Sequence, residues 1–161
     1  MTEKDYNECV RLYADNVYRF ILKNLKNEDD AKDVVQSSFE KMWSNKEVVE
    51  NLKCKSFLFT VAYNTMIDHI RKNKRIVLKD DFEETALGSH NQQQNTKRIL
   101  EEALNKLNER DRSLVMLKDY EGYNYAEIGE ITNLNESQVK VYLHRARLQL
   151  REYLVKMENV I

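Results

Sequence analysis

Two segments of this sequence combine cations with side chains that can recognise nucleic-acid bases. The first spans residues 137–151, which hold four Lys or Arg residues and no acidic residue. If this segment is a helix, its outer face carries Gln138, Lys140, Val141, Tyr142, His144 and Arg145. Amides, phenols and cations near the start of a helix are the groups that read base edges in the major groove. The competing interpretation is a surface helix whose cations only complement its own C-terminal dipole.

The second segment spans residues 57–75. Four of its last five residues are cations, namely Arg71, Lys72, Lys74 and Arg75. It also carries three aromatic residues and Asn64 on faces that cannot all be buried, the aromatic residues being Phe57, Phe59 and Tyr63. Aromatic rings beside cations suit unpaired bases, which stack on the rings while the cations follow the phosphates. The alternative is an ordinary cationic helix end beside aromatic core residues.

No pattern in the sequence predicts catalysis. His69, His90 and His144 are dispersed, and the sequence contains no HExxH, GxGxxG or CxxC motif. Two cysteines, Cys9 and Cys54, lie within apolar helical patterns and are predicted to be reduced core residues. We therefore expect no catalytic residue, no metal site and no cofactor.

Composition indicates the elements that must position these segments. The 161 residues include 3 glycines and no proline, and 42% are hydrophobic, which favours an all-α fold. In the first half, apolar periodicity predicts helices over 4–25, 28–43 and 57–74. Asn27 and Ser56 are the expected N-caps of the second and third helices. The inward stripe of the second helix includes Val34, Phe39 and Trp43.

The second half is predicted to contain a helix-turn-helix at about 127–146. Four helices are expected, over 97–107, 109–120, 125–132 and 136–157, with Thr96, Asn108, Asn124 and Asn135 as their N-caps. Glu127 stands three residues after Asn124, the spacing of a capping box. Asn133 suits a left-handed turn position, and Gly129 would allow the two helices to approach closely.

Residues 77–95 lose all periodicity and contain acidic, Gln and Asn residues, so we expect a flexible linker between domains at 1–76 and 96–161. The net charge is -1. Proteins that bind duplex DNA unaided are usually basic, because phosphate neutralisation supplies most of the affinity. If DNA is the ligand, each domain should bind it weakly and need help from another protein.

Three stretches resemble the sigma-70 family. Residues 30–43 (DAKDVVQSSFEKMW) are similar to its polymerase-binding helix, and 57–75 (FLFTVAYNTMIDHIRKNKR) to its minus-10 helix. Residues 104–147 are similar to its minus-35-reading domain. Two such blocks in this order, with only a short linker between them, resemble the small extracytoplasmic-function group. The expected fold is a sigma-2-like three-helix domain followed by a sigma-4-like domain.

The resemblance implies roles for individual residues. Asp33, Gln36 and Phe39 would dock on the clamp helices of the largest subunit of core RNA polymerase. Direct contact is expected from Asp33 and Gln36, because Phe39 also belongs to the inward stripe. Asn64 and Asp68, with the loop before Ser56, would lie near the captured non-template strand at the minus-10 element, and the cations from Arg71 to Arg75 would steer its phosphates. The minus-35 duplex would be read by Gln138, Lys140, Val141, Tyr142, His144 and Arg145.

The resemblance also implies partners and a location. A protein of this kind binds promoter DNA and core polymerase, is commonly held inactive by an anti-sigma factor, and works in the cytoplasm. No membrane insertion is expected, because the longest apolar runs are short. Val141 and Tyr142 stand where many members have Ser-Arg, so the minus-35 bases that are read should differ. Two alternatives remain at this point: a stand-alone helix-turn-helix regulator and a helical interaction protein.

Overall fold

A computed structural model describes the backbone of residues 1–77 and 92–160 and the side chains of residues 1–73 and 96–157. Every element in these ranges is helical, which confirms the all-α prediction. The elements are α1 (Glu3–Leu25), α2 (Glu28–Ser44), η1 (Asn51–Lys53), α3 (Cys54–Val77), α4 (Gln92–Lys106), α5 (Glu109–Val115), η2 (Met116–Tyr120), α6 (Tyr125–Thr132) and α7 (Glu136–Val160). We call α1–α3 the N-terminal half and α4–α7 the C-terminal half.

The N-terminal half is a three-helix bundle in which each helix packs against the other two. Thr2 and Asp5 form a capping box at the start of α1, and Asn27 caps α2 as predicted. The predicted cap at Ser56 is wrong: α3 begins at Cys54, directly after the short 3-10 helix η1. The expected inward position of Trp43 is also wrong, since its side chain is 38% exposed.

The C-terminal half follows its predicted caps more closely. Asn108 accepts a hydrogen bond from the backbone N–H of Asp111 at 2.8 Å, as an N-cap should. The helix that it starts was expected to continue to Tyr120, but its last five residues form the π-helical turn η2. Helix α4 begins at Gln92 rather than after Thr96, while α3 extends through Val77. The remaining residues of the expected linker, 78–91, lie outside the described residues.

The helix-turn-helix has the predicted local geometry. Asn124 and Glu127 form the expected capping box, with hydrogen bonds of 2.8 and 3.0 Å. Asn133 ends α6 in the left-handed conformation, at φ 58°. A Cβ on Gly129 would lie 2.6 Å from the carbonyl oxygen of Leu134, so only glycine permits this crossing. Buried side chains join the two helices, namely Ile128, Val139 and Leu143.

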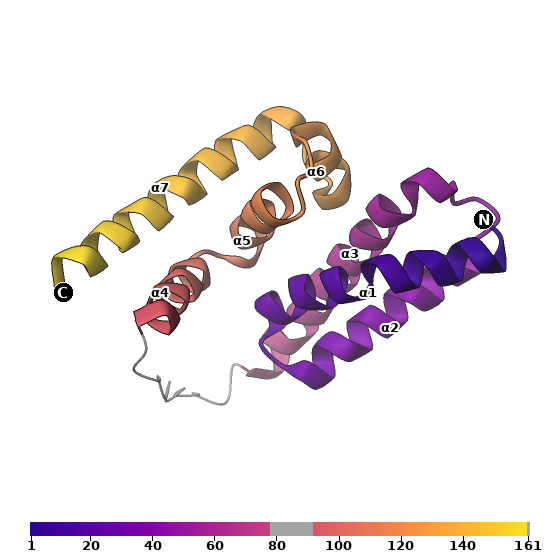
Figure 1. Ribbon diagram of the computed structural model, residues 1–161, viewed down its shortest axis with the longest axis horizontal. Coiled ribbons are helices and arrows are strands. Elements are labelled where there is room, and N and C mark those ends of the chain that lie inside the picture. The colour runs from indigo at the N-terminus through magenta and orange to yellow at the C-terminus, as the bar shows by residue number, and fades with distance from the viewer. Residues whose placement is uncertain (78–91, 161) are drawn as a thin grey trace.

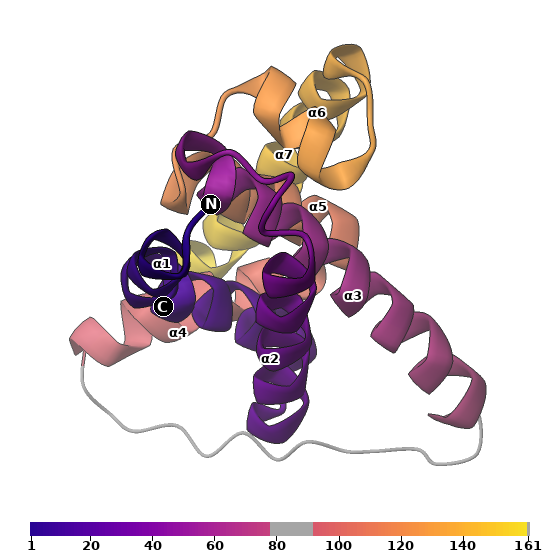
Figure 2. The ribbon, with the colours of Figure 1, turned by 90° about the vertical axis from the view of Figure 1, so that its right-hand side faces the viewer.

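The two halves pack against each other around one continuous hydrophobic core. Figure 1 shows α5 and α6 between α7 and the N-terminal bundle, and Figure 2 shows α6 and α7 on the side of the bundle opposite to α2. The largest contact between the halves joins α3 to α6. Just before α6, the ring of Tyr123 meets the ring of Phe59 of α3 edge-on, at 5.7 Å between centroids. The structure of the free chain is therefore a closed arrangement of its halves.

Candidate nucleic-acid interface

Helix α7 presents most of the predicted duplex-reading residues to solvent. The exposed members of the set are Gln138, Lys140, Val141, His144 and Arg145. Tyr142 is half-buried. Two cations of α7 are paired with acidic residues: Lys140 with Glu136 of the same helix at 3.6 Å, and Arg147 with Asp119 of η2 at 2.9 Å. The face therefore combines cations, an imidazole, an amide and an apolar side chain, as base reading requires.

Two of these residues also have structural tasks. The amide oxygen of Gln138 accepts a hydrogen bond from the backbone N–H of Asn135 at 3.0 Å, so its NH2 group is the part that can meet a base. The ring of Tyr142 stacks on the guanidinium of Arg110, whose Cζ lies 3.7 Å from the ring centroid. Arg110 itself pairs with Asp111 at 3.1 Å. Arg110 was not among the predicted site residues, and no local sequence signal connects it with Tyr142, which lies 32 positions later.

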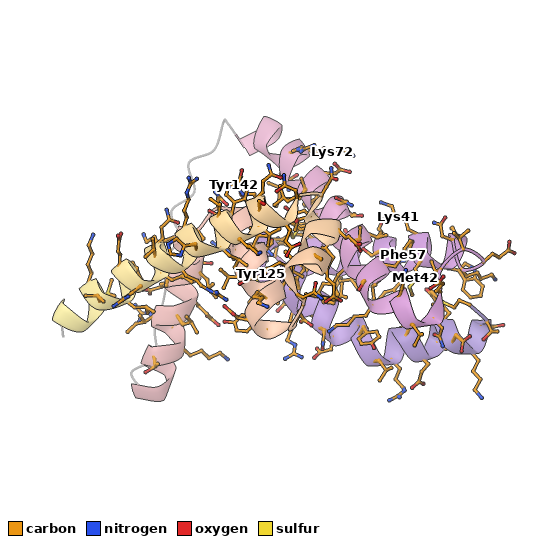
Figure 3. All side chains as sticks on the ribbon, turned by 90° about the horizontal axis from the view of Figure 1, so that it is seen from above. Lys41, Met42, Phe57, Lys72, Tyr125 and Tyr142 are labelled. Atoms are coloured by element: carbon orange, nitrogen blue, oxygen red, sulfur yellow. The ribbon has the colours of Figure 1, made fainter. Side chains whose placement is uncertain are left out.

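Helix α3 carries the second predicted nucleic-acid face. Asn64, Asp68, Arg71 and Lys72 are all exposed, and their spacing places them on one side of the helix. Figure 3 shows Lys72 on the last described turns of α3. Lys74 and Arg75 belong to the same helix, but their side chains lie outside the described residues. The exposed part of the set thus forms a polar stripe along α3.

The aromatic residues of α3 are less available than predicted. Phe59 is fully buried and Tyr63 is 6% exposed, while Phe57 is half-buried. Burial raises the pKa of Tyr63, and the positive charges of Arg110 and Arg71 oppose that rise. Because Arg110 belongs to α5, the C-terminal half contributes to the surroundings of Tyr63. In the closed arrangement, Phe59 and Tyr63 cannot stack on bases.

The segment between α2 and α3 exposes apolar side chains instead. Leu52 is 98% exposed and Val48 is 82% exposed, which are the two largest values among the exposed large hydrophobic residues that the structure describes. This segment lies before Ser56, where the sequence predicted proximity to the captured strand. The exposed fraction of Leu52 could not be predicted from sequence, because an isolated leucine in a polar stretch gives no periodic signal.

The predicted polymerase-binding residues lie on α2. Asp33 and Gln36 are exposed, and the amide of Gln36 donates to Glu40 at 3.3 Å. Phe39 is half-buried, because the Tyr6 ring packs edge-on against it and the Tyr6 hydroxyl donates to its carbonyl oxygen at 3.1 Å. Trp43, one turn later, stays partly exposed beneath the Lys46 ammonium, 3.6 Å from its ring centroid.

Two further contacts fix α2 relative to α3 and α1. The Lys41 ammonium donates to the Thr65 hydroxyl of α3 at 3.0 Å, and Met42 is fully buried against Cys9 of α1, with 3.9 Å between their sulfur atoms. Lys41 and Met42 therefore leave α2 on different sides (Figure 3). This orientation turns Asp33 and Gln36 outward.

The described ranges contain neither a metal-binding cluster nor a membrane-spanning helix. No group of three or more His, Cys, Asp or Glu residues there could hold a metal ion. Within the same part of the chain, no helix combines the length and the apolar character that a membrane span requires. The polar faces of α2, α3 and α7 are therefore the candidate functional surfaces.

Family models match both halves of the chain. Residues 9–76 match the model described as Sigma-70 region 2, and residues 97–150 match Sigma-70, region 4. The chain is 35% identical over 151 residues to RNA polymerase sigma factor SigV of Bacillus subtilis, covering 92% of this chain and 90% of that protein. It is 31% identical to ECF RNA polymerase sigma factor SigM of the same organism, covering 90% of this chain and 92% of that protein.

A solved structure agrees with the sequence relatives. The sigma factor RpoE of Bartonella quintana, solved in complex with the anti-sigma factor NepR, has a TM-score of 0.76 and 27% identity, over 94% of this chain and 97% of that one. The chain belongs to the sigma-70 family of RNA polymerase sigma factors, in the extracytoplasmic-function group. A stand-alone helix-turn-helix regulator would leave the region 2 match unexplained.

Proposed function

We propose that this chain converts core RNA polymerase into a promoter-specific holoenzyme, reading the minus-10 element with α3 and the minus-35 element with α7. One observation supports this most directly: the two family regions occur in order, and the predicted nucleic-acid residues whose side chains are described are exposed on α3 and α7, apart from the half-buried Tyr142. On α3 the contacting residues would be Asn64, Asp68, Arg71, Lys72, Lys74 and Arg75. On α7 they would be Gln138, Lys140, Val141, Tyr142, His144 and Arg145.

Helix α2 would hold the factor on the polymerase. Asp33 and Gln36 are exposed and can contact the clamp helices of the largest subunit directly. Phe39 is half-buried by Tyr6, so its contribution would be partly to keep α2 in place. The proposed domains are 1–76 for polymerase and minus-10 binding and 96–161 for minus-35 binding, with 77–95 as the linker between them.

The near-neutral charge fits this division of work. A net charge of -1 gives little general attraction to DNA. Two weak DNA contacts become strong together when a partner holds them at the right separation, because the second binding event is then intramolecular. Core polymerase would supply both that separation and all of the catalysis. This chain itself would be no enzyme and would act in the cytoplasm.

An anti-sigma factor would control the availability of these surfaces. The proposal is supported by the similarity of almost the whole chain to a sigma factor that was solved with such a partner. The partner would cover surfaces that face the polymerase.

Run-off transcription with purified core polymerase and a pool of genomic fragments tests the proposal. We expect defined transcripts that require both core enzyme and this chain. Asp33→Arg should lower co-purification with core enzyme and transcript yield together, since Asp33 is exposed on the proposed docking face. Asp15→Arg makes the same charge change on the exposed side of α1 and serves as the control. Failure of the wild-type chain to co-purify with core polymerase would refute the proposal.

A further inference from the structure

One lysine at the boundary between the halves is surrounded by aromatic rings and a carboxylate. Lys55 lies in the first turn of α3, and its side chain is 27% exposed. Its ammonium lies 5.0 Å from the ring centroid of Tyr123, 5.8 Å from that of Tyr13 and 5.9 Å from that of Phe59. A cation within about 6 Å of a ring centroid is attracted by the ring quadrupole.

The carboxylate comes from the C-terminal half. The Lys55 ammonium lies 3.4 Å from a carboxylate oxygen of Glu121 and 3.5 Å from its carbonyl oxygen. The same carboxylate accepts from the Asn16 amide at 3.4 Å, and the Glu121 side chain is only 11% exposed. Gly122, at φ 73°, lets the chain turn so that Glu121 and Tyr123 both reach Lys55. We call Lys55 with Tyr13, Phe59, Glu121 and Tyr123 the Lys55 cage.

The partners of Glu121 make this contact sensitive to charge. Both of them, Lys55 and Asn16, belong to the N-terminal half. A carboxylate withdrawn from water needs a compensating charge, and removing its partner is costly because the remaining charge stays buried. If Lys55 loses its charge, the closed arrangement keeps a desolvated carboxylate with one long amide contact. Separation of the halves returns that carboxylate to water.

Two further polar contacts cross the boundary, and both have a different balance. Lys23 of α1 pairs with Glu101 of α4 at 3.9 Å, but their side chains are 36% and 51% exposed, so solvent screens this pair. Arg112 donates to Asn24 of α1 at 3.3 Å, but it also donates to the carbonyl oxygens of Leu104, Asn105 and Leu107 in its own half. Its charge therefore remains hydrogen-bonded when the halves separate. Asn24 is neutral, and on separation its side-chain oxygen loses only the one long hydrogen bond that it accepts from Arg112. The Lys55 cage thus has the stronger dependence on the closed arrangement.

We propose that the Lys55 cage, rather than the more exposed pair of Lys23 with Glu101, is the charged contact that holds the two halves in the closed arrangement and sets how readily they separate. Separation removes Tyr123 from Phe59 and α5 from the neighbourhood of Tyr63. It would uncover Tyr63 and the part of Phe59 that meets Tyr123, while Phe59 keeps its contact with Phe20 of α1. The proposal concerns the free chain, and only its consequence for promoter opening rests on the proposed function.

Small-angle X-ray scattering of the full chain measures the separation without any polymerase. Lys55→Glu should raise the ratio of open to closed molecules by about tenfold or more, because it places two carboxylates together. Lys53→Glu makes the same charge change two residues earlier, on an exposed side chain, and should leave the scattering curve unchanged. The exchanged pair Lys55→Glu with Glu121→Lys should return the curve toward that of the wild type.

Circular dichroism of each variant shows whether the helices are retained. If Lys55→Glu does not fold, Lys55→Met keeps most of the stem, removes the charge and takes its place in the scattering measurement. An unchanged curve for a folded Lys55 variant would overturn the proposal, as would an equal change in Lys53→Glu. Because the measurement contains no polymerase or DNA, these outcomes are independent of whether the chain directs transcription.

Discussion

The two helices proposed to contact DNA differ in what holds their surfaces in place. On α7, the predicted reading face depends on contacts within the C-terminal half: the close crossing at Gly129, the turn at Asn133 and the stacking of Arg110 on Tyr142. On α3, the polar stripe is exposed but Phe59 and Tyr63 are covered in the closed arrangement. The proposed minus-35 surface is therefore held by contacts within one half, whereas the burial of the aromatic residues beside the proposed minus-10 surface depends partly on the other half.

The internal contacts of the C-terminal half should carry the largest stability effects. Arg112 is 5% exposed, and its guanidinium donates to three backbone carbonyls around the end of α4. This burial lowers the pKa of Arg112. Arg112→Met should lower the free energy of unfolding by about 3 kcal/mol, because it leaves these carbonyls without their donor. Urea denaturation followed by circular dichroism measures this change.

Arg98→Met is the matched control for that measurement. Arg98 pairs with Glu102 at 3.0 Å on the exposed side of α4. An exposed pair of this kind contributes about 0.5 kcal/mol or less. If Arg112→Met and Arg98→Met lowered the free energy of unfolding by similar amounts, the buried Arg112 would contribute no more to stability than an exposed ion pair.

The next largest effect is expected at Gly129, where α6 and the turn before α7 approach closely. Gly129→Ala should cost about 2 kcal/mol, since its methyl group would meet the Leu134 carbonyl oxygen and force the helices apart. Thermal unfolding measures the loss. Gly122→Ala provides a contrast, because nothing lies within 4 Å of a Cβ there and only the strain of φ 73° opposes it, at about 1 kcal/mol. A smaller loss at Gly129 than at Gly122 would contradict the argument.

The functional counterpart of this comparison is the reading face of α7. Arg145→Ala should weaken minus-35-dependent promoter binding by the holoenzyme about tenfold, the loss of one good base or phosphate contact. Co-purification with core enzyme should not change, because Arg145 is far in sequence from the α2 residues proposed to dock there. Lys156→Ala, near the exposed end of α7, is the control. Equal losses of promoter binding and core binding would contradict the assignment.

Features that depend on local contacts could be predicted from the sequence, whereas features that depend on packing between distant residues could not. Asn27, Asn108, Asn124 and Asn135 were all predicted as caps and all accept the expected hydrogen bonds, because caps depend on residues three positions apart. Local rules also gave the left-handed turn at Asn133. The periodic apolar pattern gave the number and order of the main helices.

Long-range contacts were not predictable in this way. The start of α3 follows from η1 and not from a cap, and no propensity rule gives the π-helical turn at Met116–Tyr120. Trp43 fits an inward helical stripe, yet α1 leaves it partly exposed between Tyr6 and Lys46. The stacking of Arg110 on Tyr142 and the burial of Tyr63 depend on how helices pack, which a single sequence does not specify. The sequence could therefore place the candidate residues on helices, but it could not show which of their side chains are exposed to a ligand.

The smallest expected effect concerns the N-terminal half, where α1 starts with the same type of capping box as α6. The Asp5 carboxylate accepts from the Thr2 backbone N–H at 3.2 Å, and the Thr2 hydroxyl accepts from the Asp5 backbone N–H at 3.1 Å. Hydrogen bonds from the Thr2 backbone and side chain lower the pKa of Asp5. A lowered carboxyl pKa means that ionised Asp5 stabilises the fold above its unfolded pKa and loses this contribution as the pH falls.

Asp5→Asn should therefore reduce the free energy of unfolding slightly at pH 7, and its difference from the wild type should narrow below about pH 4. Denaturant titrations at both pH values measure the two differences. Asp15→Asn, in the middle of the exposed side of α1, lies outside the box and should not lose stability in this pattern. If the Asp5→Asn difference stayed constant with pH, the start of α1 would not depend on an ionised box. The two halves would then differ in their helix ends as well as in their DNA-facing surfaces.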